Sequence, residues 1–173
     1  PATFEQASYY ARGPWDCYVD RYDAALLGRY QTTVTDMFEL TARPQTCGNR
    51  IDLRELTLAD STNGLQLHVK AQGQAAFQLL HYDDSKMSAF KHCWDIAPGN
   101  VYLHLDYMQK GLGNGSCGQG TGTLDEYLCP SKGTYTNTFR IRPESITATG
   151  VQQATDPGSA LQIAVLPGQV VCR

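Results

Sequence analysis

Apolar and polar side chains alternate along several short stretches of the chain, as they do in half-buried β-strands. In residues 65–71 every second side chain is apolar, and the same period of two recurs in residues 101–108, 135–142 and 159–166. In residues 50–60 the apolar phase changes partway along, which indicates a bulge or a bend. The pattern therefore predicts a chain built mainly of β-strands.

Turn-forming residues separate these stretches, at Asn63-Gly64, Pro98-Gly99-Asn100, Lys132-Gly133 and Asp156-Pro157-Gly158. Only residues 83–94 have helical spacing, and we expect about two turns of helix there. Successive strands without helical crossovers favour antiparallel pairing. The predicted fold is an all-β antiparallel sandwich with one short helix.

The length of 173 residues fits one domain with a sizeable core. Residues 144–173 follow a proline and are poorer in aromatic side chains than residues 1–143. We therefore expect residues 144–173 to form a β-rich terminal extension, a hairpin, on a main unit of residues 1–143.

Composition excludes some classes of function. The net charge is −3, and no cluster of Lys or Arg provides the basic stripe that nucleic-acid binding needs. No apolar run approaches the ~18 residues of a membrane span. The first ten residues lack the features of a signal peptide and the chain has no initiator Met, so we expect a piece of a longer protein.

Six cysteines are more than a cytosolic domain of this size usually carries, which favours a periplasmic or secreted location over the cytoplasm. They form no CxxC pair and have no spacing typical of zinc. Their even number permits three disulfides. Because an isolated cysteine usually behaves as a small hydrophobe, we expect free, partly buried thiols instead.

The glycine-rich segment at residues 111–120 is the most conspicuous candidate site. It matches neither the Walker pattern nor the dinucleotide fingerprint, and no helix follows it. Ser116 and Cys117 lack the motif of an activated nucleophile. We expect an irregular loop in which glycines provide backbone conformations with positive φ.

Charged residues gather in a second candidate segment, which contains Arg12, Asp16, Asp20, Arg21 and Asp23. Two carboxylates there could act as an acid/base pair. The alternative that we favour is a structural loop held by bridges between the arginines and the carboxylates. Aromatic side chains crowd the first thirty residues, where they suit either a sugar-stacking surface or a sandwich core.

Two histidines are read in the same structural way. His104 lies on the polar face of its expected strand, and His92 lies near the end of the expected helix. We expect both to be hydrogen-bonded structural residues rather than metal ligands.

Three separated stretches together resemble one family. They are "YYARGPWDCYVDRYDAALLGRY", "RPQTCGNRIDLRELTLAD" and "HLDYMQKGLGNGSCGQGTGTLDEYLC", the last followed by "YTNTFRIRP". In order and spacing they are similar to the C-terminal small-chain domain of β-galactosidases of glycoside hydrolase family 2, over about residues 7 to 143. The resemblance implies the later part of a galactose-mutarotase-like β-sandwich.

The resemblance also implies roles for residues. Gly115, Ser116 and Cys117 would border the galactoside pocket of a catalytic barrel elsewhere in the same polypeptide. Cys117 stands where the best-known members have a sugar-stacking tryptophan. The ion-pair loop of Arg12, Asp16, Asp20 and Arg21 would be structural, as would Arg50, Asp52 and Arg54.

The catalytic glutamates of the family, and any Mg²⁺, belong to the barrel. A retaining glycosidase needs two carboxyl groups about 5–5.5 Å apart, and no stretch here matches the motifs that supply them. We therefore expect an accessory domain of a retaining β-galactosidase, inactive alone, that shapes the pocket and supports assembly, including a homo-oligomer. The alternatives are a free-standing carbohydrate-binding module and a mutarotase-like epimerase.

Overall fold

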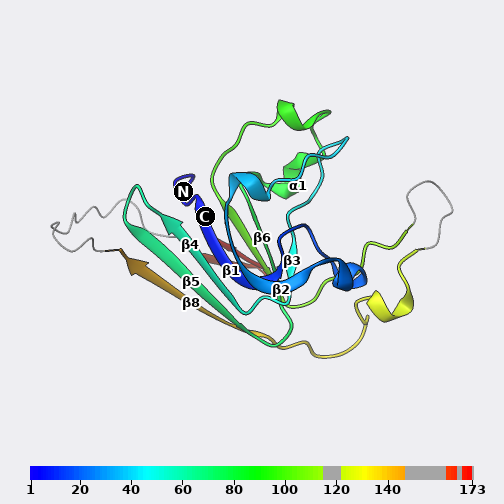
Figure 1. Ribbon diagram of the computed structural model, residues 1–173. Coiled ribbons are helices and arrows are strands. Elements are labelled where there is room, and N and C mark those ends of the chain that lie inside the picture. Colours follow the sequence, from blue (N-terminus) through cyan, green and yellow to red (C-terminus); the bar gives the residue numbers. More distant parts are fainter. Residues whose placement is uncertain (115–121, 147–162, 167–168, 173) are drawn as a thin grey trace.

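The computed structural model describes residues 1–114, 122–146, 163–166 and 169–172 (Figure 1). All strand pairs in this part of the chain are antiparallel. They form a five-stranded sheet, a three-stranded sheet and a separate two-stranded pair. The predicted all-β antiparallel fold is confirmed.

The five-stranded sheet has the order β2 (Leu26–Thr33), β1 (Gln6–Gly13), β4 (Glu55–Asp60), β5 (Leu65–Gln72) and β8 (Thr138–Ser145). The three-stranded sheet has the order β3 (Arg50–Ile51), β6 (Ala76–Leu80) and β7 (Tyr102–Asp106). The two-stranded pair is β9 (Ile163–Leu166) with β10 (Gln169–Cys172).

The main core lies between the five-stranded and three-stranded sheets. Alternate residues of β1, β4 and β5 point inward, and Tyr9, Leu56 and Val69 are each at most 3% exposed. From the facing sheet, Phe77 packs edge-on against Tyr9 with ring centroids 5.2 Å apart. Burying one such large apolar side chain stabilises the fold by about 1.5–3 kcal/mol. The sandwich is therefore held by side chains that the alternation places on one face.

The phase change in residues 50–60 marks a crossing between sheets. β3 belongs to the three-stranded sheet, whereas β4 belongs to the five-stranded sheet. Asp52, between them, has a φ of 55°, in the left-handed region. The backbone thus bends to pass from one layer to the other, which is the second of the two predicted alternatives, a bulge or a bend.

The helical segments are short: α1 (Asp84–Met87) and the 3₁₀ turns η1 (Val19–Ala24), η2 (Thr35–Met37), η3 (Cys93–Asp95) and η4 (Asp125–Tyr127). The predicted two-turn helix is reduced to the single turn α1. Within α1 only Met87 is buried, against Cys47 and Leu80. The two residues that follow Met87, Ser88 and Ala89, are exposed.

β8 runs through Pro143, where the sequence predicts the start of a terminal extension. Pro143 is paired with Leu67 on the edge of the sheet, and an edge strand tolerates a residue without an N–H donor. The pair β9–β10 lies where a hairpin is predicted, and β10 lies beside β7. The division of the chain at residue 143 stays a prediction.

Four cysteines have described side chains, and all four are free thiols. Cys17, Cys47 and Cys93 are buried, and Cys129 is exposed. The prediction of free thiols is confirmed for these four, while the side chains of Cys117 and Cys172 lie outside the described part of the chain.

Candidate functional site

The base of the glycine loop is a closed neck, formed by residues 111–113 and 122–127. The amide of Gly111 donates to the carbonyl of Tyr127 at 2.9 Å, and the hydroxyl of Thr123 donates to the carbonyl of Gly111 at 2.9 Å. Gly111 is buried, whereas the next residue, Leu112, is exposed. The two ends of the loop are thus held together. Gly115, Ser116 and Cys117 lie outside the described residues.

Asp20 fixes this neck from a distant part of the sequence. Its Oδ2 accepts a hydrogen bond of 2.6 Å from the amide of Gly113. Burial acts to raise the pKa of Asp20, but the amides of Gly113 and Leu112 outweigh it and lower the pKa below its ordinary value. Oδ1 of Asp20 is a buried acceptor without a described donor.

Steric contact explains why glycines occupy the neck. A Cβ on Gly111 would lie 2.7 Å from Cγ of Asp20. At Gly113, where φ is 73°, a Cβ would lie 2.7 Å from the amide nitrogen of Thr123. The predicted positive φ is therefore present at Gly113, whereas Gly111 is required by close approach.

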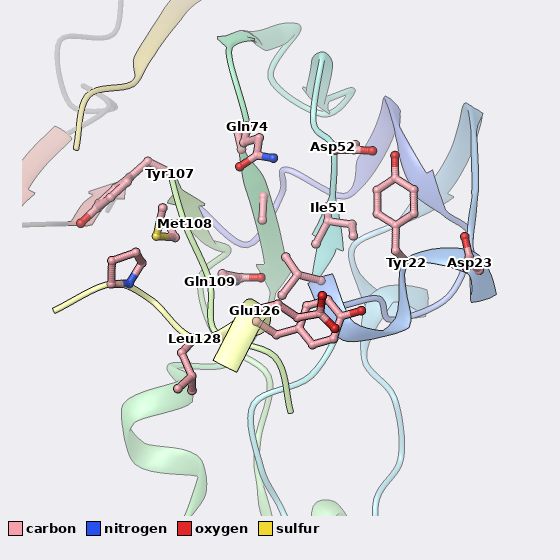
Figure 2. A pocket seen from close by; sticks show the side chains of 15 residues that line it. Tyr22, Asp23, Ile51, Asp52, Gln74, Tyr107, Met108, Gln109, Glu126 and Leu128 are labelled. Atoms are coloured by element: carbon pink, nitrogen blue, oxygen red, sulfur yellow. The ribbon is translucent and has the colours of Figure 1, made fainter. Parts of the chain in front are cut away.

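A pocket of about 590 Å³ opens beside the neck (Figure 2). Its size falls within the roughly 300–1,000 Å³ of small-molecule sites. Its walls come from η1, from the crossing after β3, from the segment after β7 and from η4. The polar side chains that line it are Tyr22, Asp23, Asp52, Gln74, Gln109 and Glu126. η4 belongs both to the neck and to one wall of the pocket. The neck and the pocket are therefore structurally connected.

Arg12 organises one side of the pocket. Its Nε lies 2.8 Å from Oδ2 of Asp52, and its Nη1 donates to the carbonyl of Ala25 at 2.8 Å. Its guanidinium carbon lies 3.3 Å from the ring centroid of Tyr22. Stacking of arginine on an aromatic face is favourable. The pair Arg12–Asp52 therefore orients the Tyr22 wall.

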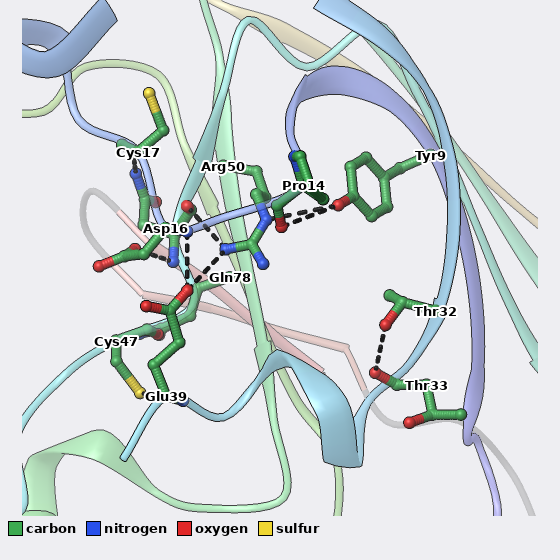
Figure 3. Close-up of polar contacts among 11 residues, drawn as sticks. Tyr9, Pro14, Asp16, Cys17, Thr32, Thr33, Glu39, Cys47, Arg50 and Gln78 are labelled. Carbon is green, nitrogen blue, oxygen red and sulfur yellow. Dashed lines mark hydrogen bonds and ion pairs between the residues drawn. The ribbon is translucent and has the colours of Figure 1, made fainter. Parts of the chain in front are cut away.

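A second polar cluster contains Asp16, Glu39 and Arg50 (Figure 3). Asp16 accepts a hydrogen bond of 2.6 Å from the amide of Asn49, and its own amide donates to Glu39 at 2.7 Å. Arg50, 3% exposed, lies 3.7 Å from Glu39, and its Nε donates to the hydroxyl of Tyr9 at 3.4 Å. Burial and the nearby Glu39 raise the pKa of Asp16 to about 6.

Asn49 connects this cluster to the pocket. Its side-chain amide donates to the carbonyl of Cys17 and to Oε1 of Gln109, both at 2.7 Å. Gln109 also donates to Asp106 at 2.7 Å. Sequence reasoning missed both amides, because no local pattern indicates that two residues so far apart bind each other.

The predicted charged loop is only partly as expected. Arg12 pairs with Asp52, whereas Asp16 and Asp20 bind backbone amides, and the described residues form no ion pair with Arg21. Arg50 has the predicted ion pair. Arg54 lines a groove on the polar face of the five-stranded sheet, and its ion-pair role stays a prediction.

The less favoured alternative is an acid/base pair among these carboxylates, and the three carboxylates Asp16, Asp20 and Asp23 have different surroundings. Asp16 binds Asn49, Asp20 binds Gly113, and Asp23 lines the pocket. His92 has the predicted hydrogen bond, 3.1 Å from Asp95. His104 lies 3.7 Å from Asp84, which is too long for a hydrogen bond, so its predicted hydrogen bond stays a prediction.

A metal site and a membrane-spanning helix are two further features to consider among the described residues. No group of three or more His, Cys, Asp or Glu side chains there is arranged to hold a metal ion. No helix in the same part of the chain is long and apolar enough to cross a membrane.

The fold and this site define a β-sandwich module that holds a glycine loop at its base beside a ligand-sized pocket. The chain belongs to the β-galactosidase small-chain family, whose family model matches residues 1–141. The curated relatives that it matches are named β-galactosidase.

Three relatives show the extent of the similarity. The chain is 34% identical to the protein of Staphylococcus xylosus over 120 residues, which is 68% of this chain and 12% of that protein. It is 29% identical to the protein of Priestia megaterium over 143 residues, 82% of this chain and 14% of that protein. It is 31% identical to that of Streptococcus thermophilus over 143 residues, 81% of this chain and 14% of that protein. The matched region is thus about one seventh of these relatives or less.

Proposed function

We propose that this chain is the accessory C-terminal β-sandwich of a family 2 β-galactosidase. In this proposal the neck of the glycine loop borders the pocket in which the catalytic barrel hydrolyses terminal β-galactosides with retention. The observation that carries it is the family match over residues 1–141, which includes both the neck-forming Gly111 and its anchor Asp20. The rest of the enzyme supplies the chemistry.

The contacts of the carboxylates support an accessory role. Retaining hydrolysis needs a nucleophile and an acid on opposite sides of the glycosidic bond, about 5–5.5 Å apart. Beside the pocket, Asp52 is bound to Arg12 and Asp20 is bound to the backbone of the neck, so these two carboxylates have structural partners. Asp23 and Glu126 also line the pocket. In this proposal, any Mg²⁺ of the enzyme is held by the catalytic barrel.

Holding the neck is the mechanical contribution of this chain. Glycine loses more backbone entropy on ordering than any other residue, so a glycine loop is costly to order when it meets a ligand. The hydrogen bonds of Gly111 and Gly113 fix the base of the loop before any ligand arrives. Such preorganisation lowers the cost of binding.

An exposed apolar strip supports the proposed role in assembly. The strip consists of Trp15, Leu40 and Trp94, which are 69%, 80% and 81% exposed. Hydrogen bonds join its parts: the Asp16 amide binds Glu39, and the Cys93 thiol donates to the carbonyl of Thr41. Exposed aromatic side chains in one region are typical of interfaces. We assign this strip to contact with the catalytic barrel.

The experiment measures hydrolysis of a nitrophenyl β-galactoside. The chain alone should show no turnover above a buffer blank. In the β-galactosidase that contains the chain, Asp20→Ala should raise KM about tenfold, because the neck loses its anchor. The control Asp36→Ala removes an exposed carboxylate and should leave KM unchanged. Turnover proportional to the concentration of the chain alone, or equal KM values for the two variants, would contradict the proposal.

A carbohydrate-binding module is the second candidate. Trp94 stacks on His92 with centroids 4.5 Å apart and remains 81% exposed, as an aromatic platform for a sugar would. Glycan binding by the chain alone that Trp94→Ala abolishes would favour this candidate over the accessory role.

A further inference from the structure

One row of side chains crosses all five strands of the larger sheet. In the strand register, Tyr10 lies opposite Arg29 on one side and Glu55 on the other. Glu55 lies opposite Lys70, and Lys70 lies opposite Arg140. We call Arg29, Tyr10, Glu55, Lys70 and Arg140 the charged row. It lies on the face of the sheet that points away from the core.

Glu55 is the single carboxylate of this row, and each of its two oxygens forms an ion pair. Its two carboxylate oxygens lie 3.0 Å from Arg29 and 2.9 Å from Lys70. These two partners lower the pKa of Glu55, so the carboxylate is charged at neutral pH. Among the described contacts, neither oxygen of Glu55 is paired with Arg140.

The row places like charges opposite each other. Lys70 and Arg140 are direct cross-strand partners, an arrangement that destabilises a sheet. Arg54 lines the same groove, and neither Arg54 nor Arg140 has an ion pair within the described part of the chain. A surface selected for stability alone would place an acid at one of these positions. The excess of positive charge instead indicates a site that an anion completes.

The charged residues surround a groove of about 410 Å³. Four cations and one carboxylate leave an excess of three positive charges there, on a chain whose net charge is −3. This volume falls within the roughly 300–1,000 Å³ of small-molecule sites. Gln72 and Thr138 border the groove with an amide and a hydroxyl, groups that both donate and accept hydrogen bonds.

We propose that this groove binds an anionic saccharide, a sugar that carries a sulfate or carboxylate group. The anionic group lies between Lys70, Arg140 and Arg54, where arginine provides planar, charge-assisted donors. The sugar hydroxyls meet Gln72, Thr138 and Tyr10. The site lies on the polar face of the sheet, away from the glycine loop, so it does not depend on the proposed function.

The test is calorimetric titration of the 173-residue chain with galactose 6-sulfate, galactose and inorganic sulfate. Galactose 6-sulfate should bind at least about fivefold more tightly than either of the others, because only it engages both the cations and the neutral donors. Raising the salt concentration should weaken binding. Equal affinity for inorganic sulfate or for galactose would overturn the assignment to an anionic saccharide, as would the absence of binding.

Matched variants locate the site. Arg140→Gln should weaken binding of galactose 6-sulfate about tenfold through loss of a charge-assisted bond. Arg43→Gln removes the same charge from an exposed loop and should leave binding unchanged. The thermal midpoint of Arg140→Gln should equal or exceed that of the parent chain, because the repulsion from Lys70 is relieved. Equal weakening by both variants would overturn the proposed site.

Discussion

Asn49 and Gln109 bind each other through both ends of their side-chain amides. Asn49 Nδ2 donates to Oε1 of Gln109 at 2.7 Å, and Gln109 Nε2 donates to Oδ1 of Asn49 at 2.8 Å. The pair connects the residue before β3 to the segment after β7. Because Gln109 lines the pocket, this reciprocal contact fixes one wall relative to the sheet.

Removing the buried side chain of Asn49 should therefore lower the stability of the fold. Asn49 is 1% exposed, and Asn49→Ala leaves the carbonyl of Cys17 and Oε1 of Gln109 without their donor. We expect the free energy of unfolding in urea to fall by about 2 kcal/mol. The exposed control Gln31→Ala should change it by less than about 0.5 kcal/mol. Equal losses of unfolding free energy in the two variants would show that the amide pair adds no more stability than an exposed polar side chain does.

Gly111→Ala tests the close approach of Asp20 to the neck. The added Cβ would meet Asp20, which cannot withdraw without giving up its bond to Gly113. We expect a loss of about 1–3 kcal/mol in unfolding free energy. Gly122→Ala, in the same neck, places its Cβ in open space and should be nearly neutral. A neutral Gly111→Ala would mean that the neck yields easily.

Asp16 should make stability depend on pH in a defined direction. Its pKa is raised from 3.8 to about 6 in the folded chain, so between these values the folded state binds more protons than the unfolded state. Stability from this group is present below about pH 4 and is lost as the pH rises toward 6. Asp16→Asn does not titrate.

The difference in unfolding free energy between Asp16→Asn and the parent chain should therefore shift in favour of the variant from pH 4 to pH 6. Urea unfolding at several pH values measures it, with Asp36→Asn, an exposed carboxylate, as control. A difference that is constant with pH would show that the Asp16 carboxyl is not perturbed.

The apolar strip should matter for assembly and not for the fold of this chain. Trp15→Ala and Trp94→Ala should each change unfolding of the chain by less than about 0.5 kcal/mol, because both side chains face solvent. In the β-galactosidase that contains the chain, the same changes should lower the temperature at which activity is lost, since buried interface tryptophans often contribute 2 kcal/mol or more. Ile146→Ala, 40% exposed at the end of β8, serves as control.

Alternation predicted the strands whose two faces differ. β5, β7 and the core of β8 lie within the stretches identified from period two, with inner residues such as Leu67 and Leu103 buried. β6 was missed because all five of its residues, Ala76–Leu80, are buried, so its sequence has no alternation. β1 was missed because its inner face pairs the small Ala7 and Ala11 with an aromatic residue, a pattern that resembles a loop rich in tyrosine.

The candidate site was predictable only in its parts. The glycine loop is visible as a local run of residues, but its anchor Asp20 lies 93 residues before Gly113. The partner of Arg12 is likewise distant, since Asp52 follows it by 40 residues. A sequence shows which charged residues are close along the chain. The contacts of the folded chain instead join residues that the strand order brings together, and the sequence alone does not show that order.

The charged row has a further consequence, for the alignment of the strands during folding. Side chains alternate between faces, so a slip of one residue in β4 would turn Glu55 into the core and Leu56 out to water. Burying an unpaired charge costs far more than exposing an apolar side chain to water. Because each strand contributes a polar member to the row, each pairing carries its own penalty for misalignment. The row thus favours the native strand register over shifted, aggregation-prone pairings.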